Sequence, residues 1–156
     1  MINSYSESAL KRIREAKNYE ELLDVALNVL WDFHGVNSHK PVAMVCGPIS
    51  TGGKGSRKKN LEVFSKAIDR VSIGGLLIFS QMPFEDDMER IYKSDPALQS
   101  LKLLEEFYLP ILKTGFIKLM CFLPGWENSI GASWEHDQAK KLHIPVLYLS
   151  ELYIAD

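Results

Sequence analysis

Residues 117–149 read IKLMCFLPGWENSIGASWEHDQAKKLHIPVLYL, and this stretch decides the fold. Its first, apolar part predicts a strand from Phe116 to Leu123. A Pro-Gly pair then predicts a loop, and the pattern after it predicts a helix over 132–143. Pro145 separates this helix from a further strand, Val146 to Leu149. Strand, loop, helix and strand in this order are typical of a parallel α/β unit.

One carboxylate of this stretch falls where an apolar side chain is expected. At 100° per residue, Glu135 shares a narrow arc of the helix with Ala132, Ala139 and Leu142. This arc should meet the sheet, where an unpaired carboxylate costs several kcal/mol, about 2–7, or shifts its pKa. Two interpretations are open: a structural Glu135 held by a salt bridge or backbone N–H groups, and a catalytic carboxylate at the rim of a pocket.

A second strand–loop–helix unit lies earlier in the chain. Pro41 to Cys46 predicts a buried strand, and the following loop, 47–60, is rich in glycine, hydroxyl groups and cations. Backbone N–H groups of such a loop can approach an anion, and Arg57 could complete the cradle. The loop is not a Walker A motif, because Gly53 stands where the lysine is required. The alternative is a surface loop that binds nothing.

The alternation of strands and helices predicts a three-layer α/β fold with a parallel sheet. A further strand is expected from Leu76 to Phe79, which makes four, and a fifth could lie within 81–92. Residues 84–96 could form a short helix or a lid, and Pro110 should break or restart a helix over 97–108. The loops 47–60 and 124–131 both leave carboxyl ends of strands, so we expect them to meet across a pocket.

Two helices are expected before the first strand. Ser6 to Ala16 predicts the first, and Asn18 with Glu21 predicts a capping box for the second. The second helix has a broad apolar face formed by Leu22, Val25, Ala26, Val29, Leu30 and Phe33. We expect this face to contribute to a homodimer interface, the alternative being burial on the chain's own sheet. A linker over 34–39 would then divide a helical extension, 1–38, from the main domain, 39–156.

Composition narrows the class of protein. The chain has 156 residues, 46% of them hydrophobic and 24% charged, and a net charge of −2. This charge favours no nucleic-acid polymer, and no apolar run or signal peptide indicates a membrane. Cys46 and Cys121 are expected as buried thiols in a reducing cytoplasm, with a disulfide as the alternative. No spacing indicates a metal site, and His136 and His143 are expected on helix flanks.

Two motifs together resemble a known family. They are CGPISTGG at 46–53 and GWENSIGASWE at 125–135, followed by Ala139. They resemble the nucleoside 2-deoxyribosyltransferase superfamily, and within it small bacterial and phage proteins with a GPxS/T loop and an LPGWExSxGAxxE helix. The resemblance covers about 41–149. It implies a Rossmann-like, flavodoxin-like sheet and an enzyme without a cofactor, which forms a dimer or larger homo-oligomer with composite sites.

The resemblance also implies a reaction and residue roles. Its enzymes cleave the N-glycosidic bond of 2′-deoxynucleosides or their 5′-monophosphates, and Glu135 matches the nucleophile. Ser129 matches a serine that binds the 5′-phosphate in the hydrolase branch. Glu127, Glu106 or Glu105 would protonate the leaving base. The expected substrate-binding residues are Gly47, Pro48, Ile49, Ser50, Gly52, Gly53, Arg57, Trp126, Ser129 and Gly131.

The sequence departs from the family pattern at two places. Met44 occupies the position of a tyrosine that the family places near the nucleophile. No aspartate lies between Asp95 and Asp137, where the family has one that assists the base or ribose. These departures favour the alternative function, a non-catalytic sensor that binds a nucleotide or an ADP-ribose-like ligand.

Overall fold

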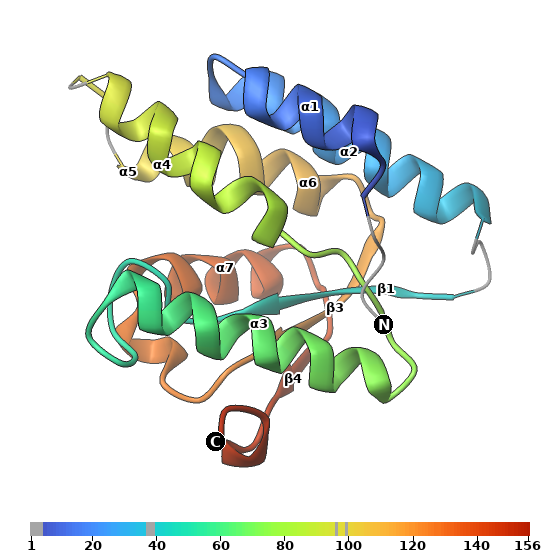
Figure 1. The fold of residues 1–156 in the computed structure, drawn as a ribbon. Helices are drawn as coiled ribbons and strands as arrows, with labels where there is room; N and C mark the ends of the chain where they lie inside the picture. The colour runs from blue at the N-terminus through green and yellow to red at the C-terminus, as the bar shows by residue number, and fades with distance from the viewer. Residues whose placement is uncertain (1–4, 37–39, 96, 99) are drawn as a thin grey trace. The chain divides into compact units, whose positions relative to one another are not determined.

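The computed structural model describes residues 5–36, 40–95, 97–98 and 100–156 (Figure 1). They form two compact units, a sheet unit of residues 40–80 and 117–156 and a helical unit of the described residues within 5–36 and 81–116. The helical unit thus combines part of the expected extension, 1–38, with residues 81–116 of the expected main domain, 39–156. Residues 1–4 and 37–39, which include part of the expected linker, lie outside the described residues.

The sheet unit contains four parallel strands in the order β2-β1-β3-β4. These strands are β1 (Val42–Cys46), β2 (Leu77–Ile78), β3 (Ile117–Phe122) and β4 (Val146–Tyr148). All five residues of β1 are buried, as expected for a central strand covered on both faces. The possible fifth strand was wrong, because its residues form the short turn η1 (Met82–Phe84) and helix α4 (Glu85–Ser94).

Two helices cover the two faces of this sheet. Helix α3 (Arg57–Ile73) connects β1 to β2, and α7 (Ile130–Lys141) connects β3 to β4. The two connections run in opposite directions across the sheet, so right-handed crossovers place their helices on opposite faces (Figure 1). The predicted three-layer α/β class is thus confirmed, and the strand order is that of flavodoxin-like folds without their fifth strand.

The strand register determines which side chains face α7. Cys46, Phe122 and Tyr148 are register partners across β1, β3 and β4. The Phe122 and Tyr148 rings lie against His136 of α7, so this row of three side chains faces that helix. Because side chains alternate along a strand, the preceding pair, Val45 and Cys121, faces the other layer. Both cysteines are buried and free, as predicted.

The helical unit begins with a capped helical hairpin. Helix α1 (Glu7–Glu15) starts at Ser6, whose Oγ accepts a hydrogen bond from Ala9 N at 3.1 Å. Helix α2 (Tyr19–Val36) starts after Asn18, whose Oδ1 accepts from Glu21 N at 2.9 Å. The Glu21 carboxylate accepts in turn from Lys17 N at 2.6 Å, one residue before the position that a capping box uses.

The apolar face of α2 is covered within its own unit. Leu22, Ala26 and Leu30 are fully buried, and α2 packs against α1, η2 and α6. The remaining elements of this unit are α5 (Ser100–Leu103), the π-helical turn η2 (Leu104–Tyr108) and α6 (Leu109–Lys113). The expectation that this face forms a homodimer interface was therefore wrong. Residues 104–113, which form η2 and α6, supply the apolar partner instead.

The helix restarts at Pro110, which is one of the two expected outcomes. Pro110 lies in the first turn of α6, where a missing N–H leaves no intrahelical bond unmade. The π-helical turn η2 stands directly before this turn. Gly115 follows α6 with a φ of 81°, a left-handed conformation that glycine adopts without strain.

Candidate active site

Two loops meet at the carboxyl edge of the sheet, as expected. The loop after β1 provides Thr51, whose Oγ1 accepts a hydrogen bond from Ile130 N, at the start of α7, at 2.9 Å. The loop after β3 contains the short turn η3 (Trp126–Asn128). Gly52 approaches this turn so closely that a Cβ would lie 2.7 Å from Asn128 O. Its φ of 72° also favours glycine, so the contact requires this residue.

The Asn60 side chain stabilises the loop after β1 through hydrogen bonds. This side chain is buried on the first turn of α3. Its Oδ1 accepts from Lys54 N at 2.8 Å, and its Nδ2 donates to Ile49 O at 2.8 Å and to Gly52 O at 3.2 Å. Gly53 lies against the Asn60 side chain, and a Cβ there would also lie 2.8 Å from Pro48 Cβ. The glycines of this loop therefore have a packing function.

The cavity between these loops is small. It has a volume of about 30 Å³ and is lined by residues of both loops, of α3 and of the C-terminal tail beyond η4 (Glu151–Tyr153). This volume suits one or two water molecules, whereas ligand pockets have volumes of about 300–1,000 Å³. A nucleotide would therefore bind outside this cavity.

Ser129 begins α7. It is buried, and its Oγ accepts a hydrogen bond from Ala132 N at 3.2 Å, which makes it the N-cap of the helix. Ser133 Oγ donates back to Glu127 O at 3.2 Å and so ties α7 to η3. A capping hydroxyl keeps its own proton as a donor. Ser129 can therefore cap the helix and donate to a ligand oxygen at the same time.

Glu135 lies on the inner face of α7, as its position in the sequence predicted. Only 7% of its surface is exposed. Cys46, at the end of β1, donates a hydrogen bond from its thiol to Glu135 Oε2 at 3.2 Å. Burial raises the pKa of the Cys46 thiol well above its usual value, and the neighbouring Glu135 raises it further. The thiol therefore stays protonated and acts as a donor.

An aromatic cluster adjoins this pair. The Trp126 ring stacks on the His136 ring at 4.1 Å, and the Phe122 ring meets His136 edge-on at 5.1 Å. His136 Nε2 lies 2.6 Å from the Tyr148 hydroxyl oxygen, at hydrogen-bond distance. His136 lies on α7 beside its inner face, and stacking by Trp126 buries its ring. His143 was expected on the flank of this helix, but α7 ends at Lys141 and His143 is exposed in the turn that follows.

The burial of His136 makes the stability of the protein depend on pH. Burial lowers the pKa of His136, so the unfolded chain binds its proton at higher pH than the folded chain does. The contribution of His136 to stability is complete above its pKa in the unfolded chain, about 6.5. This contribution is lost as the pH falls through its lower pKa in the folded chain. We expect urea unfolding to show a smaller loss of stability on acidification in His136→Gln than in the wild type.

His143→Asn is the matched control for this measurement. His143 is exposed and has a φ of 57°, which asparagine tolerates. It should keep the wild-type pH dependence. An unchanged pH dependence in His136→Gln would show that His136 is not the titrating group.

The other predicted residues lie in both units. Gly131 and Trp126 are half-buried near the start of α7, and Glu127 is exposed on η3. Gly47 and Pro48 are buried, whereas Ser50 is exposed and Arg57 begins α3. Glu106 and Glu105 belong to the helical unit, where both are exposed, and Glu106 lies 3.9 Å from Lys102 Nζ.

Three further residues of the sheet unit were not predicted as site residues: Cys46, Thr51 and Asn60. A signal for Asn60 was present, because it precedes Phe64, Ala67 and Ile68 on the apolar face of α3. This is the same anomaly that identified Glu135. Cys46 and Thr51 lie in the CGPISTGG motif, but nothing local predicted their contacts, because their partners are distant in sequence.

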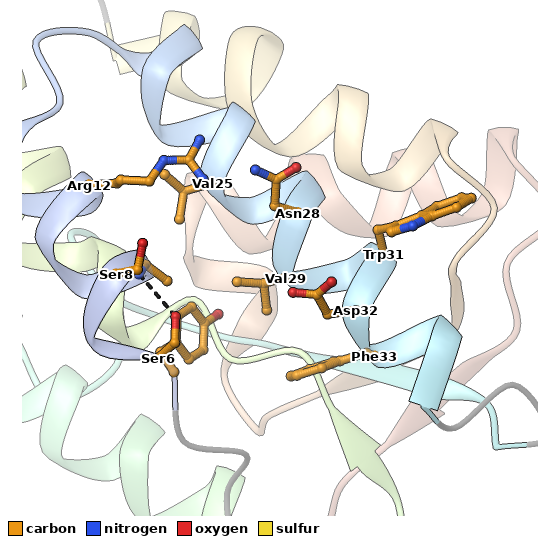
Figure 2. A pocket seen from close by; sticks show the side chains of 11 residues that line it. Ser6, Ser8, Arg12, Val25, Asn28, Val29, Trp31, Asp32 and Phe33 are labelled. Atoms are coloured by element: carbon orange, nitrogen blue, oxygen red, sulfur yellow. Dashed lines mark hydrogen bonds between the residues drawn. The ribbon is translucent and has the colours of Figure 1, made fainter.

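The helical unit has a groove of about 420 Å³ between α1 and α2 (Figure 2). Val25 and Val29 lie at its base, and Arg12, Asn28 and Asp32 are exposed along it. None of the predicted site residues lines this groove. Among the described residues, no group of His, Cys, Asp or Glu side chains could hold a metal ion. Within the same part of the chain, no helix is long and apolar enough for a membrane span.

The fold and this site define an α/β protein with a buried carboxylate at the carboxyl edge of a parallel sheet. Residues 42–148 match the family described as Domain of unknown function (DUF4406). The match covers more than half of the chain, which therefore belongs to the DUF4406 family. No curated protein and no solved structure matches the chain.

Proposed function

We propose that this protein cleaves the N-glycosidic bond of a 2′-deoxynucleoside or its 5′-monophosphate through a covalent intermediate on Glu135. The observation that carries the proposal is the buried Glu135 carboxylate, 3.2 Å from the Cys46 thiol and on the helix that begins where the two loops meet. A buried carboxylate in such a position is typical of a functional site. The DUF4406 match spans nearly the same residues as the resemblance to nucleoside 2-deoxyribosyltransferases.

The reaction would proceed in two displacements. A Glu135 oxygen attacks C1′, the C1′–N bond breaks, and its electron pair leaves with the base, which takes a proton from a general acid. A water molecule or a second base then attacks C1′ and gives its proton to the conjugate base of that acid, and the ester bond breaks to restore the Glu135 carboxylate. Two displacements at one carbon retain its configuration. Glu127, on η3 directly before α7, is the candidate for this acid within the sheet unit.

The same geometry supports a phosphorylated substrate. The Ser129 hydroxyl stands at the N-terminus of α7, where backbone N–H groups and the helix dipole favour an anion. A hydrogen bond to a charged group contributes about 1.5–3 kcal/mol. We therefore infer tighter binding of 5′-monophosphates than of nucleosides, by about tenfold or more.

Base release by the purified chain tests this proposal. Each deoxynucleoside and its 5′-monophosphate would be incubated with the protein, and free base would be measured by chromatography. We expect release from at least one monophosphate, faster than from the matching nucleoside. The proposed activity is wrong if no member of the panel yields base. Faster release from the nucleoside would contradict the phosphate preference alone.

One observation favours a second function, a sensor that binds a nucleotide without turning it over. Met44, at the family's tyrosine position, is fully buried in β1. It supplies no hydroxyl group for a reacting sugar. A sensor would bind a nucleotide or an ADP-ribose-like ligand in calorimetry and release no base in the panel, which separates the two functions.

A further inference from the structure

The Cys46–Glu135 contact depends on the strand register and on the α7 crossover. The two residues are 89 positions apart in sequence, and both are buried. Cys46 faces α7 because its register partner Phe122 does so, and Glu135 projects from α7 toward the sheet. The thiol thus meets the carboxylate at the carboxyl end of the central strand.

A carboxylate in this position needs a group that keeps it ionised. Burial opposes ionisation, whereas a nucleophile must be ionised to attack. The dipole of α7 is a weak source of help, because Glu135 lies beyond the first turn of Ile130–Lys141, where the dipole effect falls off. A hydrogen bond donated to the charged form does favour that form.

The Cys46 thiol has the properties of such a donor. It is completely buried, so it does not exchange this partner for water. A thiol is also a weaker donor than a hydroxyl group. The thiol can therefore orient the carboxylate and favour its ionised form. Because the hydrogen bond is weak, the lone pair that attacks carbon stays available.

We propose that Cys46 is the positioning residue of Glu135: its thiol donates to Oε2, orients the carboxylate and keeps it in the ionised, nucleophilic form. This inference rests on the proposed function for the role of Glu135 as a nucleophile. The hydrogen bond itself is independent of that function. Cys46 would thereby supply a side-chain donor next to the carboxylate in a chain whose β1 carries Met44 in place of tyrosine.

Direct titration of Glu135 tests the proposal without an activity assay. The full chain would be labelled with glutamate carrying ¹³C at the carboxyl carbon, and Glu135→Gln would assign the Glu135 signal. We expect the titration midpoint to move to higher pH in Cys46→Ala, because the carboxylate loses the hydrogen bond from the thiol. Cys46→Ser keeps a donor and should not show this upward shift.

Cys121→Ala is the matched control. Cys121 is an equally buried thiol on the neighbouring strand, and it faces the opposite layer. Its removal should leave the Glu135 midpoint unchanged. Where base release is detected, Cys46→Ala should release base about tenfold more slowly than the wild type. The acidic limb of its pH–rate profile should move to higher pH. Cys46→Ser should recover much of the wild-type rate.

The outcomes separate this proposal from the proposed function. Equal Glu135 midpoints in the wild type, Cys46→Ala and Cys46→Ser would overturn the role of Cys46, whatever the activity. A midpoint shift specific to Cys46→Ala would support it. If Cys46→Ala shows this shift but the wild-type protein releases no base, the glycosidase function is refuted. The positioning of the Glu135 carboxylate by Cys46 is then still established.

Discussion

Glu135→Gln should reduce the release of free base at least about a thousandfold, because removal of a covalent nucleophile removes the reaction path itself. Glutamine has nearly the same shape and can still accept the Cys46 hydrogen bond, but its amide does not attack C1′. The substitution also removes a buried charge, so the folded state should be as stable as the wild type or more stable. Base release and urea unfolding, measured on the same preparation, check both expectations.

Asp137→Asn is the matched control for this variant. Asp137 lies on the same helix and is exposed, so the change removes an equal charge without touching the inner face of α7. It should keep a rate close to that of the wild type. A Glu135→Gln protein that retained base release within tenfold of the wild-type rate would exclude Glu135 as the nucleophile.

Asn60→Ala should lower the free energy of unfolding by about 2–4 kcal/mol. The substitution leaves Lys54 N, Ile49 O and Gly52 O without their side-chain partner, and a buried unsatisfied group costs about 1–3 kcal/mol. Some of this cost is recovered where water reaches the loop, because the three bonds are only partly buried. Urea unfolding at fixed pH measures the difference.

Two comparisons make the Asn60 result specific. Asn28→Ala makes the same change at an exposed position of α2, and we expect it to alter stability by less than about 0.5 kcal/mol. Asn60→Asp keeps an acceptor for Lys54 N but places a buried carboxylate oxygen against Ile49 O and Gly52 O, so it should be no more stable than Asn60→Ala. Equal free energies of unfolding for Asn60→Ala and Asn28→Ala would show that the Asn60 side chain does not stabilise the loop after β1.

Much of the sheet unit could be predicted because its information is local. Apolar runs such as Val42–Cys46 and Ile117–Phe122 predicted the central strands. Helical periodicity placed Glu135 on the inner face of α7, where the structure has it. The side chains of Ser6 and Asn18 predicted the starts of α1 and α2. In each case, residues within about two helical turns or one strand contain the whole signal.

The helical unit shows where local information ends. A broad apolar face on α2 indicates that something covers it, but not what. The cover includes η2 and α6, which are far along the chain and join α2 only in the folded state. The same reason explains why the expected homodimer interface was wrong: periodicity measures how much surface must be buried and carries no information about its partner.

The sequence by itself determined the α/β class, the parallel strands and the presence of an anomalous carboxylate at residue 135, because each follows from a spacing along the chain. Only the tertiary structure decided what surrounds that carboxylate. Cys46 reaches Glu135, Thr51 reaches the start of α7, and Tyr148 reaches His136. These contacts depend on strand order and register, and a parallel sheet joins strands that crossover helices keep far apart in sequence.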